Sequence, residues 1–237
     1  FPQKSLSIFA RSHLGPSSFD YPLFPGAGIN EYEAFVLRNS GNDWESTMMR
    51  DGFITSIADH LNIDHQRYRP ALLFLNGEFW GIQNIREKVN EHFIASNHSI
   101  ESEHIDLLDI QGVNDENIVH GTNADYQILL NYLDTQDIND PIVENALENW
   151  IDIESYMSYQ AFQIFVVNRD WPGNNIKFWR DHRVGGKWRW ILYDTDFGFS
   201  IWDAYAYTFN TLNFALDPYG PGWPNPEKAL RKVAQKI

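Results

Sequence analysis

The sequence contains no cysteine, and this absence removes several classes of chemistry. Disulfide bonds, zinc sites with thiolate ligands and catalysis by a thiol are all excluded. Basic residues are also scarce, because 18 Lys and Arg stand against 32 Asp and Glu, which gives a formal net charge of −14. Proteins that bind nucleic acid or anionic membranes carry a basic face, so this charge argues against both kinds of partner.

Long apolar runs are missing as well. No apolar stretch reaches the roughly 18 residues that a membrane span requires, so we expect no such span. The eight His show no spacing typical of a zinc site. What the sequence does contain is 43% hydrophobic residues, 15% of all positions being aromatic, and this composition is sufficient for a folded core.

The order of the expected elements predicts an α+β fold. Alternating or continuous apolar residues predict strands over residues 4–11, 34–38 and 105–110, and the Asn76-Gly77 turn between two apolar runs predicts a hairpin over 68–89. Helical spacing predicts helices over residues 48–61, 90–95, 125–134, 141–149, 152–168 and 226–237, whereas 205–226 has an irregular, aromatic pattern. Strands followed by helices are typical of α+β proteins.

We therefore expect two lobes. The strands of residues 4–110 should form one mainly antiparallel sheet in an N-lobe, residues 1–112. The helices should form a C-lobe, residues 113–237, after the polar junction of residues 111–123.

Two polar clusters late in the chain are the strongest functional signal. The first, residues 168–175, contains Asp170 and, five positions later, Asn175. The second follows an apolar strand and contains Asp194 and the tripeptide Asp196-Phe197-Gly198. This order of residues is the one that protein kinases use. Because Asn, Asp, Pro and Gly also mark ordinary turns, either cluster alone is open to that second interpretation.

Phosphoryl transfer explains why such residues would occur together. The reaction needs positioning of the acceptor hydroxyl and a divalent ion on the phosphates, and Mg²⁺ prefers carboxylate and amide oxygens. Asp170 is the candidate catalytic base, and Asn175, Asp194 and Asp196 are candidate metal ligands that should converge on one ion. Asp196 matches the kinase tripeptide, whereas Asp194 ends the strand directly, so both are retained.

The chain resembles the spore coat protein H (CotH) kinase family over nearly its whole length. The resemblance rests on motifs in the same order, which occupy residues 2–5, 37–44, 75–82, 86–88, 168–179 and 188–199. It implies an atypical protein kinase-like two-lobed fold, with an antiparallel N-lobe sheet and a mainly helical C-lobe. It also implies ATP and Mg²⁺ as cofactors, with Mn²⁺ or Ca²⁺ as alternatives, a protein substrate, and a secreted or cell-surface bacterial location.

The resemblance also suggests residues for the nucleotide site. Lys4 resembles the family lysine on an early strand, Glu87 would orient it as an ion pair, and Lys88 is an alternative lysine. Arg38 either lines the cleft or serves as a structural partner for one of the acids. Relative to the family pattern, we expect the segment that usually precedes the motif at residues 2–5 to be absent. We also expect the C-terminal helical region to be cut short at residue 237.

A non-catalytic alternative remains open at this stage. In that interpretation the kinase-like scaffold binds only a metal through its acidic cleft, or its aromatic loops at residues 200–224 bind a glycan or a protein.

Overall fold

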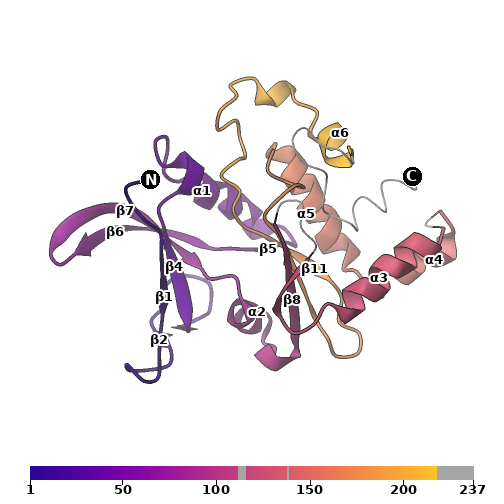
Figure 1. The fold of residues 1–237 in the computed structure, drawn as a ribbon, viewed down its shortest axis with the longest axis horizontal. Coiled ribbons are helices and arrows are strands. Elements are labelled where there is room, and N and C mark those ends of the chain that lie inside the picture. The colour runs from indigo at the N-terminus through magenta and orange to yellow at the C-terminus, as the bar shows by residue number, and fades with distance from the viewer. Residues whose placement is uncertain (112–115, 138, 218–237) are drawn as a thin grey trace.

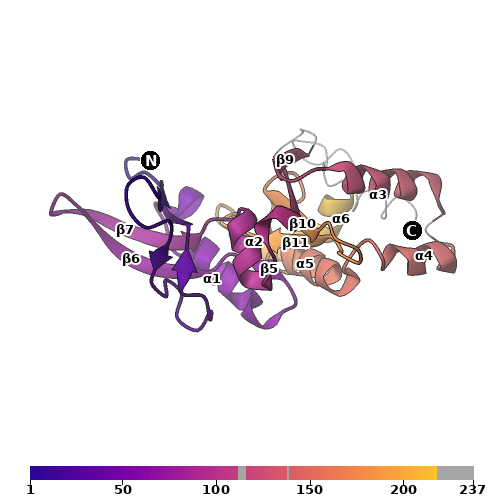
Figure 2. The ribbon, with the colours of Figure 1, turned by 90° about the horizontal axis from the view of Figure 1, so that it is seen from below.

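The protein is described by a computed structural model that covers residues 1–111, 116–137 and 139–217. Its two lobes lie side by side, with a long β-hairpin at one end of the molecule and helices at the other (Figure 1). The view from below shows the same elongated arrangement (Figure 2). The molecule therefore has the α+β two-lobed fold that was predicted.

The N-lobe sheet is antiparallel and has the strand order β1-β4-β7-β6. Its strands are β1 (Leu6–Phe9), β4 (Ala34–Arg38), β6 (Tyr68–Leu75) and β7 (Glu78–Glu87), and a small ribbon of β2 (Phe19–Asp20) and β3 (Glu31–Tyr32) lies beside it. The predicted hairpin is confirmed. Its turn places Asn76 and Gly77 at φ values of 51° and 85°, the left-handed conformation that this dipeptide adopts readily.

The second sheet has five strands and belongs mainly to the C-lobe. Its order is β5 (Asp64–His65), β11 (Arg189–Leu192), β10 (Ile176–Asp181), β8 (Ile105–Ile110) and β9 (Asn117–His120). Neighbours are antiparallel except β5 and β11. The prediction that one sheet would contain every strand up to residue 110 is wrong, because β8 pairs along its full length with β10.

Helices cover both faces of this second sheet. Side chains alternate along β8, so that Ile105 and Leu107 pack toward α2 (Glu91–His98), while Leu108 and Ile110 pack toward the other helices. Those helices are α3 (Ala124–Thr135), α4 (Pro141–Leu147) and α5 (Ile153–Phe165). The larger core lies between them and the sheet, and its fully buried tryptophans include Trp171, Trp188 and Trp190.

Side-chain caps explain where several helices begin. Asn90, Asp140 and Asp152 each accept a hydrogen bond from a backbone N–H in the first turn of α2, α4 and α5. The expected helices at these places, and the one that forms α1 (Arg50–Ile57), are confirmed within a few residues. The short helix α6 (Thr211–Leu216), capped by Asn210, lies in a segment expected to be irregular.

Two sequence expectations fall outside the described residues. The helix expected at residues 226–237 is one of them. The lobe boundary expected between residues 112 and 113 is the other; it falls between β8 and β9, which are neighbours in the second sheet, and it stays a prediction. None of the helices in the described parts of the chain is long and apolar enough to cross a membrane.

Candidate functional site

Two loops between the lobes carry the residues singled out in the sequence. The Asp170 loop, residues 166–175, connects α5 to β10, and the Asp196 loop, residues 193–203, follows β11. A backbone hydrogen bond joins the two loops, in which the N–H of Phe199 donates to the carbonyl oxygen of Val166 at 2.7 Å.

Backbone strain is concentrated in these loops. Nine non-glycine residues of the described chain have a positive φ, and five of them lie here: Val167, Asn175, Asp194, Phe199 and Ser200. A β-branched residue such as Val167, at φ 54°, adopts this conformation only where the surroundings enforce it. Strain of this kind gathers at functional sites, where the fold holds groups in fixed positions.

Hydrogen bonds fix Asp170 in its loop. The side chain of Gln163 on α5 accepts from the amide of Asn168 at 2.9 Å, and Asn168 in turn accepts from the backbone N–H of Asp170 at 3.1 Å. The Oδ2 of Asp170 accepts from the amides of Asn175 at 2.6 Å and Asn174 at 3.2 Å. The predicted base and the predicted metal ligand Asn175 are therefore direct neighbours.

The surroundings of Asp170 change its acidity. Burial raises the pKa of Asp170 to about 6, and the charges of Asp194 and Asp196 act in the same direction, while the amide hydrogen bonds oppose the rise. A carboxyl group with such a pKa is mostly ionised at neutral pH and still accepts a proton readily.

Asp194 and Asp196 meet at a single cation, the guanidinium of Arg38 on β4. The Nη2 of Arg38 donates to Oδ1 of Asp194 and, at 3.0 Å, to Oδ2 of Asp196. The sequence predicted that these two carboxylates would converge on one ion, and in the structure they converge on Arg38. Asp194 adopts a left-handed conformation there, at φ 52°.

A tight turn of the N-lobe holds Asp196. The backbone N–H of Asn42 donates to Oδ2 of Asp196 at 2.9 Å, and the Asn42 amide lies 3.3 Å from Oδ1. Gly41 lies against the same carboxylate at φ 58°, and a Cβ atom there would stand 2.3 Å from Oδ2. Burial raises the pKa of Asp196, and the charge of Asp194 raises it further.

A third carboxylate, Asp51 on α1, completes the cluster. Its Oδ2 lies 3.2 Å from Nη2 of the fully buried Arg86 and 3.7 Å from Nε of Arg38. Its Oδ1 accepts from the backbone N–H of Thr195 at 2.8 Å, so Asp51 connects α1 to the Asp196 loop. Burial by itself would lower the pKa of Arg38, but Asp194, Asp51 and Asp196 outweigh it and the pKa is raised.

The lysines suggested by the family resemblance lie elsewhere. Lys4 is exposed and its ammonium donates to the carbonyl oxygen of the N-terminal residue at 2.7 Å. Glu87 is buried, and its carboxylate contacts Nη1 and the backbone N–H of Arg67, both at 2.9 Å. The predicted Lys4–Glu87 ion pair is therefore wrong. The ammonium of Lys88 lies 5.1 Å from the ring centroid of Phe9.

Sequence reasoning missed Asn42, Asp51 and Arg86 as members of the cluster. Asn42 lies in one of the motifs that carry the family resemblance, which was the available signal. Arg86 lies in another of those motifs, residues 86–88. For Asp51 the only sign was a charged residue inside an amphipathic pattern, and such residues are usually solvated. The ion pairs of Asp51 with Arg38 and with Arg86 place both residues in the cluster.

The donor atoms suit a hard divalent cation. Asp194 and Asp196 offer carboxylate oxygens to one point, where Arg38 already supplies positive charge. Asn175, on the neighbouring loop, donates its amide N–H to Asp170, and its role as a ligand of the same ion stays a prediction. Within the described part of the chain, no group of three or more His, Asp or Glu side chains is arranged to hold a metal ion. Any ion here would thus have two carboxylates and amide or water oxygens, which is typical of Mg²⁺.

Comparison with known proteins identifies the family of the chain. No curated protein matches the sequence. The family model described as CotH kinase protein matches residues 1–230 of the 237-residue chain. With its two lobes and its kinase-like order of Asp170, Asn175, Asp194 and Asp196, the chain belongs to the CotH kinase family and is a kinase-like protein.

Proposed function

We propose that this protein is a metal-dependent phosphotransferase that moves the γ-phosphate of ATP to a hydroxyl group of a protein. The observation that carries the proposal is the state of Asp170, a buried carboxyl with a pKa of about 6, held by Asn175 and facing the charges of Asp194 and Asp196. Phosphoryl transfer needs a base that positions the acceptor and carboxylates that hold a metal ion, and this site has residues of both kinds.

Each residue has a role that follows from its position. Asp170 accepts a hydrogen bond from the acceptor hydroxyl and orients its oxygen for in-line attack. Asn175, Asp194 and Asp196 would hold the cation, which neutralises charge on the phosphates. Arg38, which reaches both carboxylates, has the donors to contact a phosphate oxygen as well. Lys4, Glu87 and Lys88 remain candidate nucleotide-binding residues, although they lie apart from this cluster.

The test separates catalysis from nucleotide binding. In the Asp170→Ala variant we expect transfer of radiolabelled phosphate to fall by roughly 10²–10⁴-fold, because that is the usual contribution of a positioned base. The affinity for ATP and Mn²⁺, measured by calorimetry, should stay near the parent value, because Asp170 acts on the acceptor. Transfer at the parent rate would show that the role given to Asp170 is wrong.

Two further variants complete the test. Asp194→Ala should weaken both nucleotide binding and transfer, since the cation joins the phosphates to the protein through this carboxylate. Asp20→Ala, on an exposed position of β2, removes the same charge far from the loops and should change neither measurement.

A second candidate function is a kinase-like module that binds without catalysis. The observation in its favour is that Arg38 already neutralises Asp194 and Asp196, as a structural cation would. If neither ATP nor Mn²⁺ binds to the parent protein, this interpretation replaces the first.

We also propose that the protein acts outside a bacterial cell. The support is its membership of the CotH kinase family, which is associated with spore coat and surface proteins. Fractionation of the source cells, with detection by an antibody, tests this location, and recovery of the protein only from the cytosol would contradict it.

A further inference from the structure

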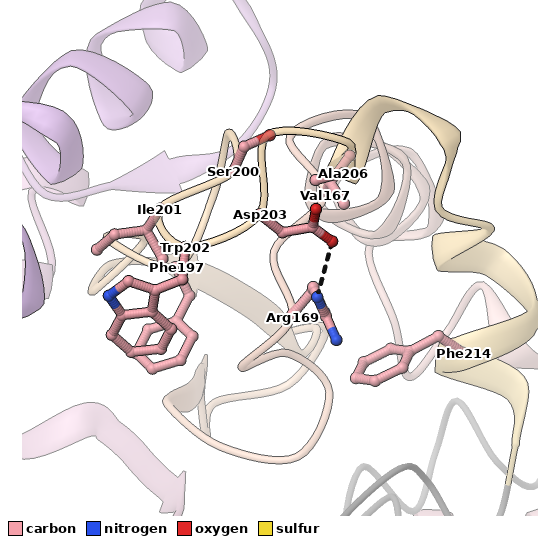
Figure 3. Close-up of a pocket in the computed structure, with 9 residues that line it drawn as sticks. All are labelled: Val167, Arg169, Phe197, Ser200, Ile201, Trp202, Asp203, Ala206 and Phe214. Atoms are coloured by element: carbon pink, nitrogen blue, oxygen red, sulfur yellow. Dashed lines mark hydrogen bonds and ion pairs between the residues drawn. The ribbon is translucent and has the colours of Figure 1, made fainter.

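A pocket with a volume of about 220 Å³ adjoins both loops of the candidate site. Arg169, which precedes Asp170, and Phe197, which follows Asp196, both line it. Figure 3 shows Phe197 and Trp202 on one side of the pocket, Phe214 of α6 on the other, and Arg169 between them. The chain segments that carry the proposed catalytic groups therefore also form the walls of this pocket.

The lining of the pocket is mainly apolar. Its apolar members come from three parts of the chain that meet only in the folded protein: Val167, Phe197, Ile201, Trp202, Ala206 and Phe214. Aromatic contacts support the walls, because the rings of Phe197 and Trp202 lie 4.7 Å apart and those of Phe209 and Phe214 lie 5.4 Å apart. Such a lining favours an apolar side chain over a charged or strongly hydrated group.

The polar side chains at the pocket are the hydroxyl of Ser200 and one ion pair. Arg169 Nη1 lies 3.5 Å from Oδ2 of Asp203, and the two side chains are 42% and 41% exposed (Figure 3). The guanidinium of Arg169 also stacks 4.6 Å from the ring centroid of Phe209, which fixes its plane. Both charged groups therefore keep hydrogen-bonding capacity for the main chain of a bound peptide.

We propose that this pocket binds an apolar side chain that lies close in sequence to the acceptor hydroxyl of the protein substrate. The inference rests on the proposed phosphotransferase function and adds a substrate class to it. Arg169 directly precedes Asp170, and Phe197 directly follows Asp196, so a peptide with its hydroxyl at Asp170 has neighbouring residues within reach of the pocket. The preferred acceptors are thus Ser, Thr or Tyr with a Leu, Met or aromatic neighbour.

Size and charge exclude the nucleotide as the occupant. Pockets for drug-sized ligands usually measure about 300–1,000 Å³, so this smaller volume suits one side chain. The triphosphate needs several cations, and Arg169 is the one cationic residue among those that line the pocket, beside the negative charge of Asp203. The cluster of Arg38, Asp194 and Asp196, which suits phosphates and metal, contributes no side chain to the pocket.

The experiment uses degenerate peptide pools with a central Ser, Thr or Tyr and one fixed neighbouring residue. Binding of fluorescein-labelled pools is measured by polarisation, and phosphate transfer from ATP with Mn²⁺ is measured in parallel. The parent protein should prefer pools with fixed Leu, Phe or Trp over pools with fixed Ser or Lys by roughly tenfold or more, as apolar pockets do.

Variants connect this preference to the pocket. Trp202 is 68% exposed, so Trp202→Ala should leave the fold intact, and it should reduce the preference to about twofold because one wall is lost. Tyr207→Ala is the matched control, since Tyr207 is a 78% exposed aromatic residue five positions away that does not line the pocket. It should keep the parent preference.

The two hypotheses fail in different ways. Transfer without preference for any neighbouring residue overturns the pocket assignment and leaves the phosphotransferase function standing. Preferential binding of apolar pools without transfer supports the pocket and counts against the enzyme. A preference that survives in Trp202→Ala, or that disappears equally in Tyr207→Ala, assigns the selectivity to another surface and also overturns the proposal.

Discussion

At the scale of single residues, Arg38 is the centre of charge at the candidate site. Its guanidinium contacts Asp194 and Asp196 on one loop and lies 3.7 Å from Asp51 on α1. Without it, these carboxylates would repel one another in a poorly solvated place. Of the two sequence interpretations of Arg38, the contacts support the structural partner of acids, and its role as a cleft residue stays a prediction.

This arrangement gives a prediction for Arg38→Ala. Removal of one partner from a buried ion pair usually lowers the free energy of unfolding by about 3–5 kcal/mol. We expect Arg38→Ala to lower it by roughly 2 kcal/mol, because the Arg38 side chain is 21% exposed. Mn²⁺ should raise the melting temperature of the variant more than that of the parent, since the carboxylates then lack a cation.

Thermal unfolding with Mn²⁺ and with EDTA measures this effect. Arg183→Ala is the control, because Arg183 is 53% exposed and pairs with its near neighbour Asp181, and such surface pairs contribute little. If Mn²⁺ stabilises parent and Arg38→Ala equally, Asp194 and Asp196 do not form a cation site.

At the scale of elements, the β6–β7 hairpin depends on its turn. Gly77 has φ 85°, and a Cβ atom added there would meet no atom within 4 Å. Glycine is therefore required by the left-handed backbone conformation and not by steric crowding. Gly77→Ala should lower the free energy of unfolding by about 1 kcal/mol, the usual cost of a left-handed Ala. Gly15→Ala is a matched control, because Gly15 is equally open but has no left-handed φ, and it should be neutral in urea unfolding. Equal effects of the two changes would contradict this account.

The sequence predicted elements whose causes are local. The hairpin turn at Asn76 and Gly77 and the helix caps at Asn90 and Asp152 act within a few residues, so they could be recognised directly. The partner of β8 could not, because β10 lies about seventy residues later in the chain and an apolar strand carries no mark of its neighbour.

The same limit explains the outcome at the candidate site. Asp194 and Asp196 were found because they stand two residues apart in a recognisable order. The predicted ion-pair partner of Glu87, Lys4, was wrong because the register of two strands decides the partner. Tyr68 lies opposite Arg86 in the sheet, so Arg67 is placed beside Glu87. The place of Asp51 in the cluster depends on how α1 packs against the rest of the protein, and no short pattern in the sequence specifies that packing.

At the scale of the whole molecule, Asp64 connects segments that lie far apart in the sequence, from β5 and α2 to β10 and β11. It lies on β5, and its carboxylate accepts from Trp179 at 2.8 Å and from Arg189 at 3.0 Å, and lies 3.1 Å from the His98 ring on α2. Burial alone would raise the pKa of Asp64, but His98 and Arg189 hold it well below its usual range.

The depressed pKa predicts how stability depends on pH. The ionised carboxylate stabilises the fold at every pH above about 4, the pKa of Asp in an unfolded chain, and this contribution is lost as the pH falls further toward the folded-state pKa. Asp64→Asn should therefore reduce stability at pH 6 and flatten its decline below pH 4. Urea unfolding at a series of pH values checks this, with the exposed Asp20→Asn as control. A decline as steep as in the parent would contradict the role of Asp64.

The contact of Arg38 with both Asp194 and Asp196 has a thermodynamic consequence. A cation that binds these carboxylates competes with the guanidinium, so its apparent affinity includes the free energy of displacing Arg38. An anion that draws Arg38 away from the carboxylates removes that competition and tightens binding of the cation. Because such linkage is reciprocal, the cation tightens binding of the anion by the same factor. One arginine thus makes the affinities for two ligands of opposite charge depend on each other.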